Sequence, residues 1–284
     1  MGITVRGAVS IADPATVARR LRLVVRERTR PASDSNAAYP YAFASGAVDP
    51  SAPSFPGPAL ELVRGQRVTI TVVNRLTVAT GVHWHGIELD SYYDGSGGGT
   101  RVAPLIAPND SFVAVMTPPR SGTFIYHAHV SDERQIALGL AGPLLVVDQR
   151  TRRDTARDHV WLFNVAGISD TTPVQLNGAR PLAPLTAGVS HRIRIINIDP
   201  GDVISLELRD AAGLVRWRPV AKDGADLPAN QATQRPARVT MGAGETWDFL
   251  WAPRRGSYRL KVDTFNKSRC ALRRETEPAL ARNR

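Results

Sequence analysis

The sequence lacks features that mark several classes of protein. It contains a single cysteine, Cys270, so no disulfide can form within one chain. No apolar run approaches the ~18 residues of a membrane-spanning helix. The first residues, from Met1 to Arg6, contain no apolar core of the ~7–15 residues found in secretory signals. We therefore expect no membrane-spanning segment, and no signal peptide is visible in this chain.

Acidic residues are also in the minority, which gives a formal net charge of +10. A basic balance can indicate nucleic acid or an acidic membrane surface as a partner. In residues 20–23 and 192–195, however, arginines alternate with apolar residues, which is typical of the solvated face of a sheet. The basic segment at 266–284 lacks interleaved aromatic residues. We therefore expect neither nucleic acid nor a membrane as a partner.

The length of the chain and its many glycines and prolines favour an all-β protein with two domains. A chain of 284 residues fits about two domains of ~100–200 residues each. Its 23 glycines and 21 prolines separate short apolar stretches, a pattern that favours β-sandwiches over helices. The predicted organisation is an N-terminal extension at 1–18, a first sandwich at 19–149, a linker near 149–158, a second sandwich at 156–265 and a basic tail at 266–284.

Alternation of apolar and polar residues predicts strands in both halves. The expected strands in the first half are 60–63, 68–72, 112–116 and 144–147, the last of them apolar enough to be buried on both faces. Those in the second half are 160–165, 192–197, 204–208, 216–221, 237–241, 246–251 and 258–262. Trp247, Phe249 and Trp251 share one face of their strand, which indicates a core position.

Four of the six histidines form two His-x-His pairs, His83 with His85 and His127 with His129. Side chains two apart on a strand point to the same face, so each pair aims two imidazoles in one direction. Two such pairs on neighbouring strands would bring four nitrogen ligands together. Imidazole ligands suit copper, zinc, iron and nickel, so the pairs predict a metal site.

Simpler explanations exist for the other candidate residues. A single buried histidine is usually a hydrogen-bonded core residue, and His159 and His191 stand alone in the sequence, so we expect surface or core positions for them. Cys270 lies in an arginine-rich segment without a neighbouring histidine, which favours an incidental thiol. Clustering of the other four histidines makes metal binding the favoured interpretation for them.

The His pairs and their surroundings resemble a known family. In the first half these segments are Pro56-Gly57-Pro58, 72–76, His83-Trp84-His85-Gly86, 122–129 and 139–144. They are similar to the first two copper motifs of multicopper oxidases. The second half resembles a domain of that family without copper motifs, in 176–178, 192–197, 223–224 and 244–248. The resemblance implies two tandem cupredoxin-like Greek-key β-sandwiches and copper as the cofactor.

Members of this family take electrons from a substrate at a blue copper and reduce O2 to water at a trinuclear copper cluster. By resemblance, His83 would bind the lone copper of the cluster, and His85, His127 and His129 its coupled pair. Asp94 lies where the family places an acidic residue beside the cluster, a position suited to proton relay. The alternative for Asp94 is an ordinary Asp-Gly turn residue.

Three further residues near the pairs are expected to support the ligands. We expect Trp84 to pack beneath the ligands. Glu133 and Gln135 are candidates to hydrogen-bond a ligand imidazole.

The sequence departs from the family pattern in one important respect. The His-x-x-His-x-His and His-Cys-His motifs are absent, and Cys270 lacks the two histidine neighbours that a blue copper needs. The chain resembles the C-terminal half of larger bacterial multicopper oxidases, particularly at 215–228. This predicts half of a trinuclear cluster, with O2 and a small reducing substrate as further partners once the cluster is complete.

The resemblance leaves two alternatives for the source of the missing copper ligands and two for the function. The missing ligands would come from a second chain or domain, or from a homo-oligomer, although every copy would lack the same ligands. The location implied is periplasmic or secreted. The alternative is a copper-binding or vestigial cupredoxin-like protein without oxidase turnover.

Overall fold

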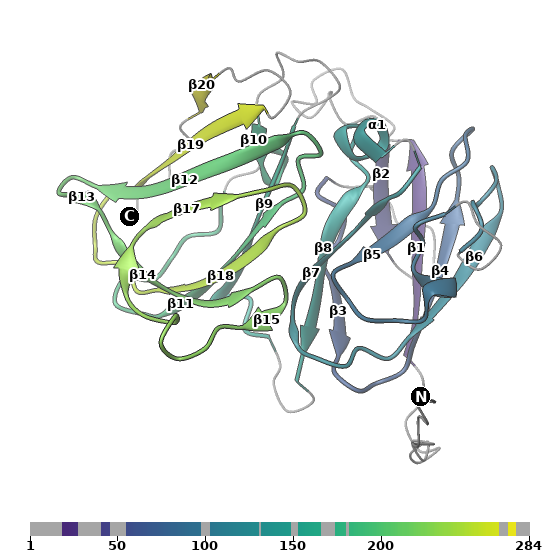
Figure 1. Cartoon of the computed structure of the whole chain (residues 1–284), viewed down its shortest axis with the longest axis horizontal. Coiled ribbons are helices and arrows are strands. Elements are labelled where there is room, and N and C mark those ends of the chain that lie inside the picture. Colours follow the sequence, from purple (N-terminus) through teal and green to yellow (C-terminus); the bar gives the residue numbers. More distant parts are fainter. Residues whose placement is uncertain are drawn as a thin grey trace, which may run out of the picture.

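A computed structural model describes residues 19–27, 41–45, 55–97, 103–130, 132–148, 153–165, 174–179, 182–266 and 272–276. The predicted extension at 1–18 and Cys270 lie outside the described residues, as does most of the basic tail. Strands dominate the described chain, and they gather in two groups that lie side by side (Figure 1). No helix among the described residues is long and apolar enough to cross a membrane.

The first group of strands forms two four-stranded sheets. One sheet has the order β2-β1-β4-β6 and the other the order β3-β8-β7-β5. Pairing is antiparallel except between β1 and β4 and between β3 and β8. The strands are β1 (Arg19–Glu27), β2 (Tyr41–Ser45), β3 (Leu60–Val63), β4 (Val68–Asn74), β5 (Val82–His85), β6 (Ser111–Met116), β7 (Gly122–Ala128) and β8 (Ala141–Val147).

The second group forms a seven-stranded and a five-stranded sheet. The first has the order β10-β9-β11-β18-β14-β15, with β16 also paired to β14; the second has the order β13-β12-β19-β20, with β17 also paired to β12. The bounds are β9 (Asp158–Val165), β10 (Val174–Leu176), β11 (His191–Asn197), β12 (Asp202–Asp210), β13 (Gly213–Leu214), β14 (Arg216–Lys222), β15 (Ala225–Asp226), β16 (Arg235–Pro236), β17 (Arg238–Met241), β18 (Thr246–Trp251), β19 (Arg259–Asn266) and β20 (Leu272–Thr276).

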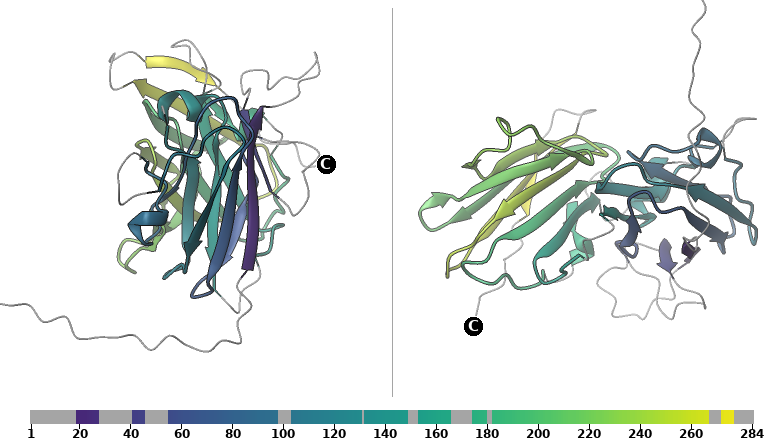
Figure 2. Two further views of the ribbon diagram at one scale, coloured as in Figure 1. Left: turned by 90° about the vertical axis from the view of Figure 1, so that its right-hand side faces the viewer. Right: turned by 90° about the horizontal axis from the view of Figure 1, so that it is seen from below.

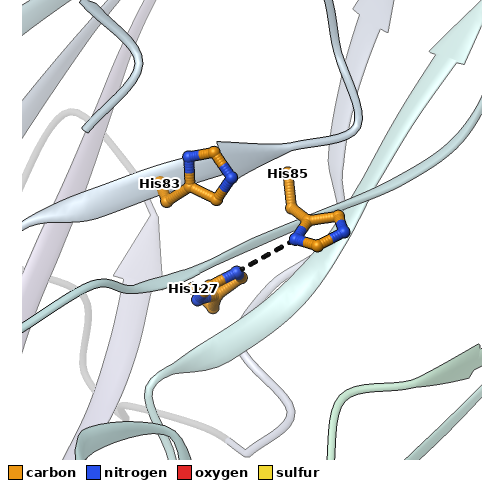
Figure 3. Close-up of side chains that lie close together, drawn as sticks. All are labelled: His83, His85 and His127. Carbon is orange, nitrogen blue, oxygen red and sulfur yellow. Dashed lines mark hydrogen bonds between the residues drawn. The ribbon is translucent and has the colours of Figure 1, made fainter. Parts of the chain in front are cut away.

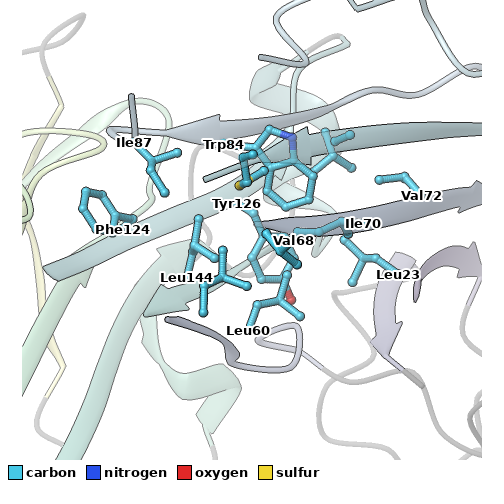
Figure 4. Close-up of a cluster of buried hydrophobic side chains, with 14 of the residues drawn as sticks. Leu23, Leu60, Val68, Ile70, Val72, Trp84, Ile87, Phe124, Tyr126 and Leu144 are labelled. Carbon is cyan, nitrogen blue, oxygen red and sulfur yellow. The ribbon is translucent and has the colours of Figure 1, made fainter. Parts of the chain in front are cut away.

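Each pair of sheets encloses its own apolar core, because alternate side chains of every strand face inward. In the first sandwich this core includes Leu23, Ile70 and Leu144, all fully buried (Figure 4). In the second it includes Phe249 and Trp251, while Trp247 is only partly buried against it. The expected all-β fold of two cupredoxin-like sandwiches is confirmed.

A third apolar cluster joins the two sandwiches. It combines buried side chains of the first sandwich with buried side chains of the second: Phe55, Ile125, Ile136 and Ala141 with Leu162, Ile196 and Ile198. Strands β7 and β18 lie in contact across this boundary, and Figure 2 shows the two sandwiches meeting along it. The sandwiches therefore share buried surface in addition to their separate cores.

The described residues also form three short helices between the strands. They are η1 (Ser91–Tyr93), α1 (Asp132–Ala137) and η2 (Asn177–Ala179). The sequence interpretation gave no helix in these places. Asp90 caps the start of helix η1, and its side chain accepts a hydrogen bond from the backbone of Tyr92. Asp94 caps the other end, beside the histidine pairs.

Candidate metal centre

Strands β5 and β7 bring the two His-x-His pairs together. The strands are antiparallel neighbours in which His83 lies opposite His127 and Trp84 lies opposite Tyr126. Because side chains alternate along a strand, the histidines share one face. Trp84 and Tyr126 share the other face, where both are buried in the core of the first sandwich (Figure 4). The expected packing of Trp84 beneath the ligands is therefore observed.

Three of the four imidazoles form a compact group. One ring nitrogen from each of His83, His85 and His127 lies within 4.8 Å of the others (Figure 3). His129 follows β7 directly; its ring centre lies 5.2 Å from that of His83 and 6.0 Å from that of His127. Nitrogen ligands lie about 2.0–2.1 Å from a bound metal ion, so small shifts would let nitrogens at this spacing share one.

Backbone carbonyls fix the orientation of two of the rings. Nδ1 of His83 lies 2.9 Å from the carbonyl oxygen of Asp94, and Nδ1 of His127 lies 2.8 Å from that of Ala128. A carbonyl oxygen only accepts, so each Nδ1 carries the hydrogen. Nε2 of both rings is then left with a lone pair for a metal ion, as is usual for ligating histidines.

Burial favours the neutral form of His85 and His127, the form that metal binding requires. Burial lowers the pKa of His127 to about 3, against a weaker opposing effect of the Ala128 carbonyl. The pKa of His85 is also lowered, first by burial and then by the neighbouring His83 ring. Imidazoles gathered at this spacing are a donor set that fits copper.

Asp94 lies against the cluster and also serves the local turn. One carboxylate oxygen of Asp94 lies 3.3 Å from Nδ1 of His83, farther than its own carbonyl oxygen. The next residue, Gly95, has φ of +80°, and a Cβ there would lie 1.7 Å from the Val82 carbonyl oxygen. This Asp-Gly turn is needed to press the carbonyl of Asp94 against β5. The turn interpretation of Asp94 therefore describes the structure, and its role beside a copper cluster stays a prediction.

The second sandwich reaches the site through residues that the sequence interpretation missed. A Cβ on Gly244 would lie 2.7 Å from Cε1 of His85. Arg120 donates to the carbonyl oxygens of Gly86 and Asp223, at 2.8 and 3.2 Å, and so ties the loop after β5 to the second sandwich. In the sequence Asp223 and Gly244 only contribute to the family resemblance. They were not assigned to the site, because nothing local marks a contact between distant segments.

The expectation for Gln135 is wrong in the described structure. Its amide nitrogen donates to the Ala79 carbonyl at 3.0 Å, and its amide oxygen accepts from the Thr80 hydroxyl at 2.8 Å. Helix α1 points this side chain at the segment before β5, and not at an imidazole. The side chain of Glu133 lies outside the described residues.

The two remaining histidines occupy the core, and they contact each other. His159 and His191 are 8% and 0% exposed, and Nε2 of His159 lies 3.0 Å from Nδ1 of His191. The parallel pairing of β9 with β11, which places His159 beside Ile193, creates this contact. Of the surface and core alternatives, the core one is confirmed, although the two residues are not isolated in space.

Comparison with known proteins shows which family the chain resembles. Residues 51–151 match the multicopper oxidase family. Over 121 residues the chain is 32% identical to copper resistance protein A of Escherichia coli, and over 190 residues it is 33% identical to laccase-5 of Trametes versicolor. The match covers 51–151 of the 284 residues, and over that region the chain is similar to multicopper oxidases, a likeness that implies copper as the metal cofactor.

The matched regions are partial. They span 43% of this chain and 19% of copper resistance protein A, and 54% of this chain and 35% of laccase-5. The chain thus spans about a fifth of the length of the first of these relatives.

Solved structures of the family share the fold over most of the chain. A multicopper oxidase of Pseudomonas thermotolerans is similar with a TM-score of 0.68 at 22% identity, over 92% of this chain and 64% of the other. A blue copper oxidase of Nitrosomonas europaea gives 0.68 at 20% identity, over 92% and 85%. At these identities the likeness establishes the cupredoxin-type fold of both sandwiches.

Proposed function

We propose that this chain is the copper-binding part of a multicopper oxidase and supplies half of the histidines of a trinuclear O2-reducing cluster. The observation that carries the proposal is the convergence of His83, His85 and His127 on one face, with His129 beside them. Under this proposal all four are copper ligands. The first sandwich, within 19–149, is the copper domain, and the second, within 156–265, is a domain without copper motifs.

The residues of the chain have distinct tasks in this proposal. His83 and His127 are held by carbonyl oxygens so that their Nε2 atoms face the site. Bound copper would supply one-electron redox chemistry towards O2. The carboxylate of Asp94, 27% exposed, touches both the His83 ring and solvent. It can therefore carry protons from water to the site, as a general acid does.

Completion of the site requires ligands that this chain does not contain. The sequence has no His-Cys-His motif to form a blue-copper site. We propose that a second chain or domain supplies it, together with the remaining cluster histidines. O2 and a small reducing substrate are then the reactants, and a periplasmic or secreted location fits this function. A homo-oligomer would bring more copies of the same four histidines without a blue copper.

Copper loading followed by reconstitution tests the proposal. The purified chain is loaded with copper, and bound metal is measured by mass spectrometry, for the unaltered chain, His127→Ala and His83→Ala. His159→Asn is the control for loss of a buried imidazole. We expect copper in the unaltered and control chains and a loss of at least tenfold in affinity in the two ligand variants. Equal binding in all four would overturn the copper site.

Oxygen consumption then separates the two functions that copper binding allows. The loaded chain is mixed with a blue-copper domain from a related oxidase, and O2 uptake is recorded with a phenol as the reductant. We expect uptake only in the mixture. Copper binding without uptake in any pairing would support the alternative function, a copper-binding cupredoxin-like protein without oxidase turnover.

A further inference from the structure

His85 is the one ligand of the compact group whose ring is oriented by packing and not by a carbonyl. Its Nδ1 faces Nε2 of His127 at 3.4 Å, while its other nitrogen points away from the cluster (Figure 3). Among the residues that the structure describes, no hydrogen bond is made by Nε2 of His85. The hydrogen bond between Nδ1 of His85 and Nε2 of His127 would be lost when both nitrogens bind copper, so another contact must then hold Nδ1 towards the site.

The second sandwich supplies that support at Gly244. A Cβ built on Gly244 would lie 2.7 Å from Cε1 and 2.9 Å from Nε2 of His85, but 3.7 Å from Nδ1. The backbone of Gly244 thus lies against the edge of the ring that faces away from His127. Contacts on this edge and at His127 confine the ring between the two sandwiches.

The turn that carries Gly244 is itself rigid. It connects β17 with β18, and the amide of Gly244 donates to the Asn197 carbonyl at 2.7 Å. The Asn197 side chain donates to the Gly242 carbonyl at 3.0 Å. Glu245 closes the turn, accepting from the Gly242 amide at 3.1 Å and from Lys222 at 3.1 Å.

The ring is freer to move than the turn. A cleft of about 160 Å³ lies beside His85, lined also by Thr123, Asp223 and Glu245. If an atom were added to Gly244, the fixed backbone would not yield. The imidazole would rotate towards this open space and carry Nδ1 away from His127.

We propose that Gly244 is a positioning residue for the copper site: the Gly242–Thr246 turn of the second sandwich presses on His85 and aims its Nδ1 at the cluster. The inference rests on the proposed function, since it assigns His85 as a ligand. It gives the sandwich without copper motifs a direct task in metal binding, and it makes the site depend on the junction between the sandwiches.

The chain contains a matched control for the test. Gly188 has φ of +76°, against +78° for Gly244, but a Cβ on Gly188 would meet no atom within 4 Å. Alanine therefore imposes the same backbone strain at both positions, and only Gly244→Ala adds contact with a ligand. Comparison of Gly244→Ala with Gly188→Ala isolates the effect on His85.

Copper affinity and the spectroscopic state of the histidines are then measured on the full chain. We expect Gly244→Ala to weaken copper binding about 10–100-fold, the range for groups that orient a ligand, and to change the electron paramagnetic resonance of bound Cu²⁺. The ring signals of His85 in the metal-free protein should shift as well. Gly188→Ala should retain the unaltered affinity and spectra.

A second variant guards against misfolding of Gly244→Ala. Glu245→Gln loosens the turn without adding an atom near His85, and we expect a smaller loss of affinity with a similar spectral shift. Equal affinity and equal spectra in Gly244→Ala and Gly188→Ala would overturn the inference while leaving the copper site intact. Failure of the unaltered chain to bind copper would instead overturn the proposed function.

Discussion

The hydroxyl of Thr123 donates a hydrogen bond to the carboxylate of Asp248 at 2.7 Å, across the boundary between the two sandwiches. Both side chains are buried, at 1% exposure each. Arg194 completes the group: one of its nitrogens donates to Thr123 at 2.7 Å and to Asp248 at 3.2 Å. Its other two donor nitrogens hold both carboxylate oxygens of Asp158. This charged network enters strand β7 at Thr123, which lies two residues before Ile125 and four residues before His127.

Removal of the negative charge at this junction should be costly. In Asp248→Asn the guanidinium of Arg194 loses the buried one of its two anionic partners, and Arg192 loses its ion pair as well. Loss of a partner in a buried pair typically costs about 3–5 kcal/mol. We expect the lower end of this range, because Asp158 remains. Asp154→Asn is the control, since the Asp154–Arg157 pair is exposed and such pairs contribute about 0–1 kcal/mol. Guanidinium unfolding followed by tryptophan fluorescence measures both; equal midpoints would contradict the prediction.

Asp94 should matter more for proton transfer than for holding metal. Its carbonyl oxygen, closer to His83 Nδ1 than its carboxylate, is retained in Asp94→Asn, so we expect copper affinity within about tenfold of the unaltered chain. Oxygen consumption of the reconstituted oxidase should fall by about 10²–10⁴, the usual contribution of a general acid. Asp110→Asn, at an exposed turn, is the control. Copper loss as severe as in His83→Ala would argue for a ligand role instead.

Burial of His159 should make the stability of the fold depend on pH. Burial, reinforced by His191, lowers the pKa of His159 below 6.5 in the folded protein. As the pH drops from 6.5 through the folded pKa, the unfolded chain binds more protons than the folded one, so the free energy of unfolding falls. Above pH 6.5 the contribution of His159 to this free energy is constant. His159→Gln should reduce this fall. Chemical unfolding of both proteins at pH 8, 6.5 and 5 measures it, and parallel curves would refute a neutral buried His159.

Much of the strand pattern follows from local alternation alone. The range 246–251 was predicted with the bounds that β18 has, and 192–197 differs from β11 by one residue. The helix α1 was missed, because its six residues are too few to show a helical period. Strand ends also shifted, as at β12, which extends past the predicted 204–208 to Asp202 and Asp210.

The site was predictable only where it is local. Side chains two residues apart on a strand share one face. The common direction of His83 and His85, and that of His127 and His129, could therefore be predicted from their spacing. The contact of His159 with His191 depends on the register of two parallel strands, and the contact of Gly244 with His85 on the docking of two sandwiches. Neither relationship leaves a mark in the local sequence, because both arise from tertiary packing.

The apolar cluster between the sandwiches limits how this chain can be divided. Phe55, Ile125 and Ile196 are fully buried there, and Leu162 joins them from β9. Each sandwich expressed by itself would expose its half of this cluster to water as an apolar patch. Exposed patches of this kind promote self-association. The sandwich that carries the histidine pairs is therefore one half of a single hydrophobic unit and should be engineered together with its neighbour.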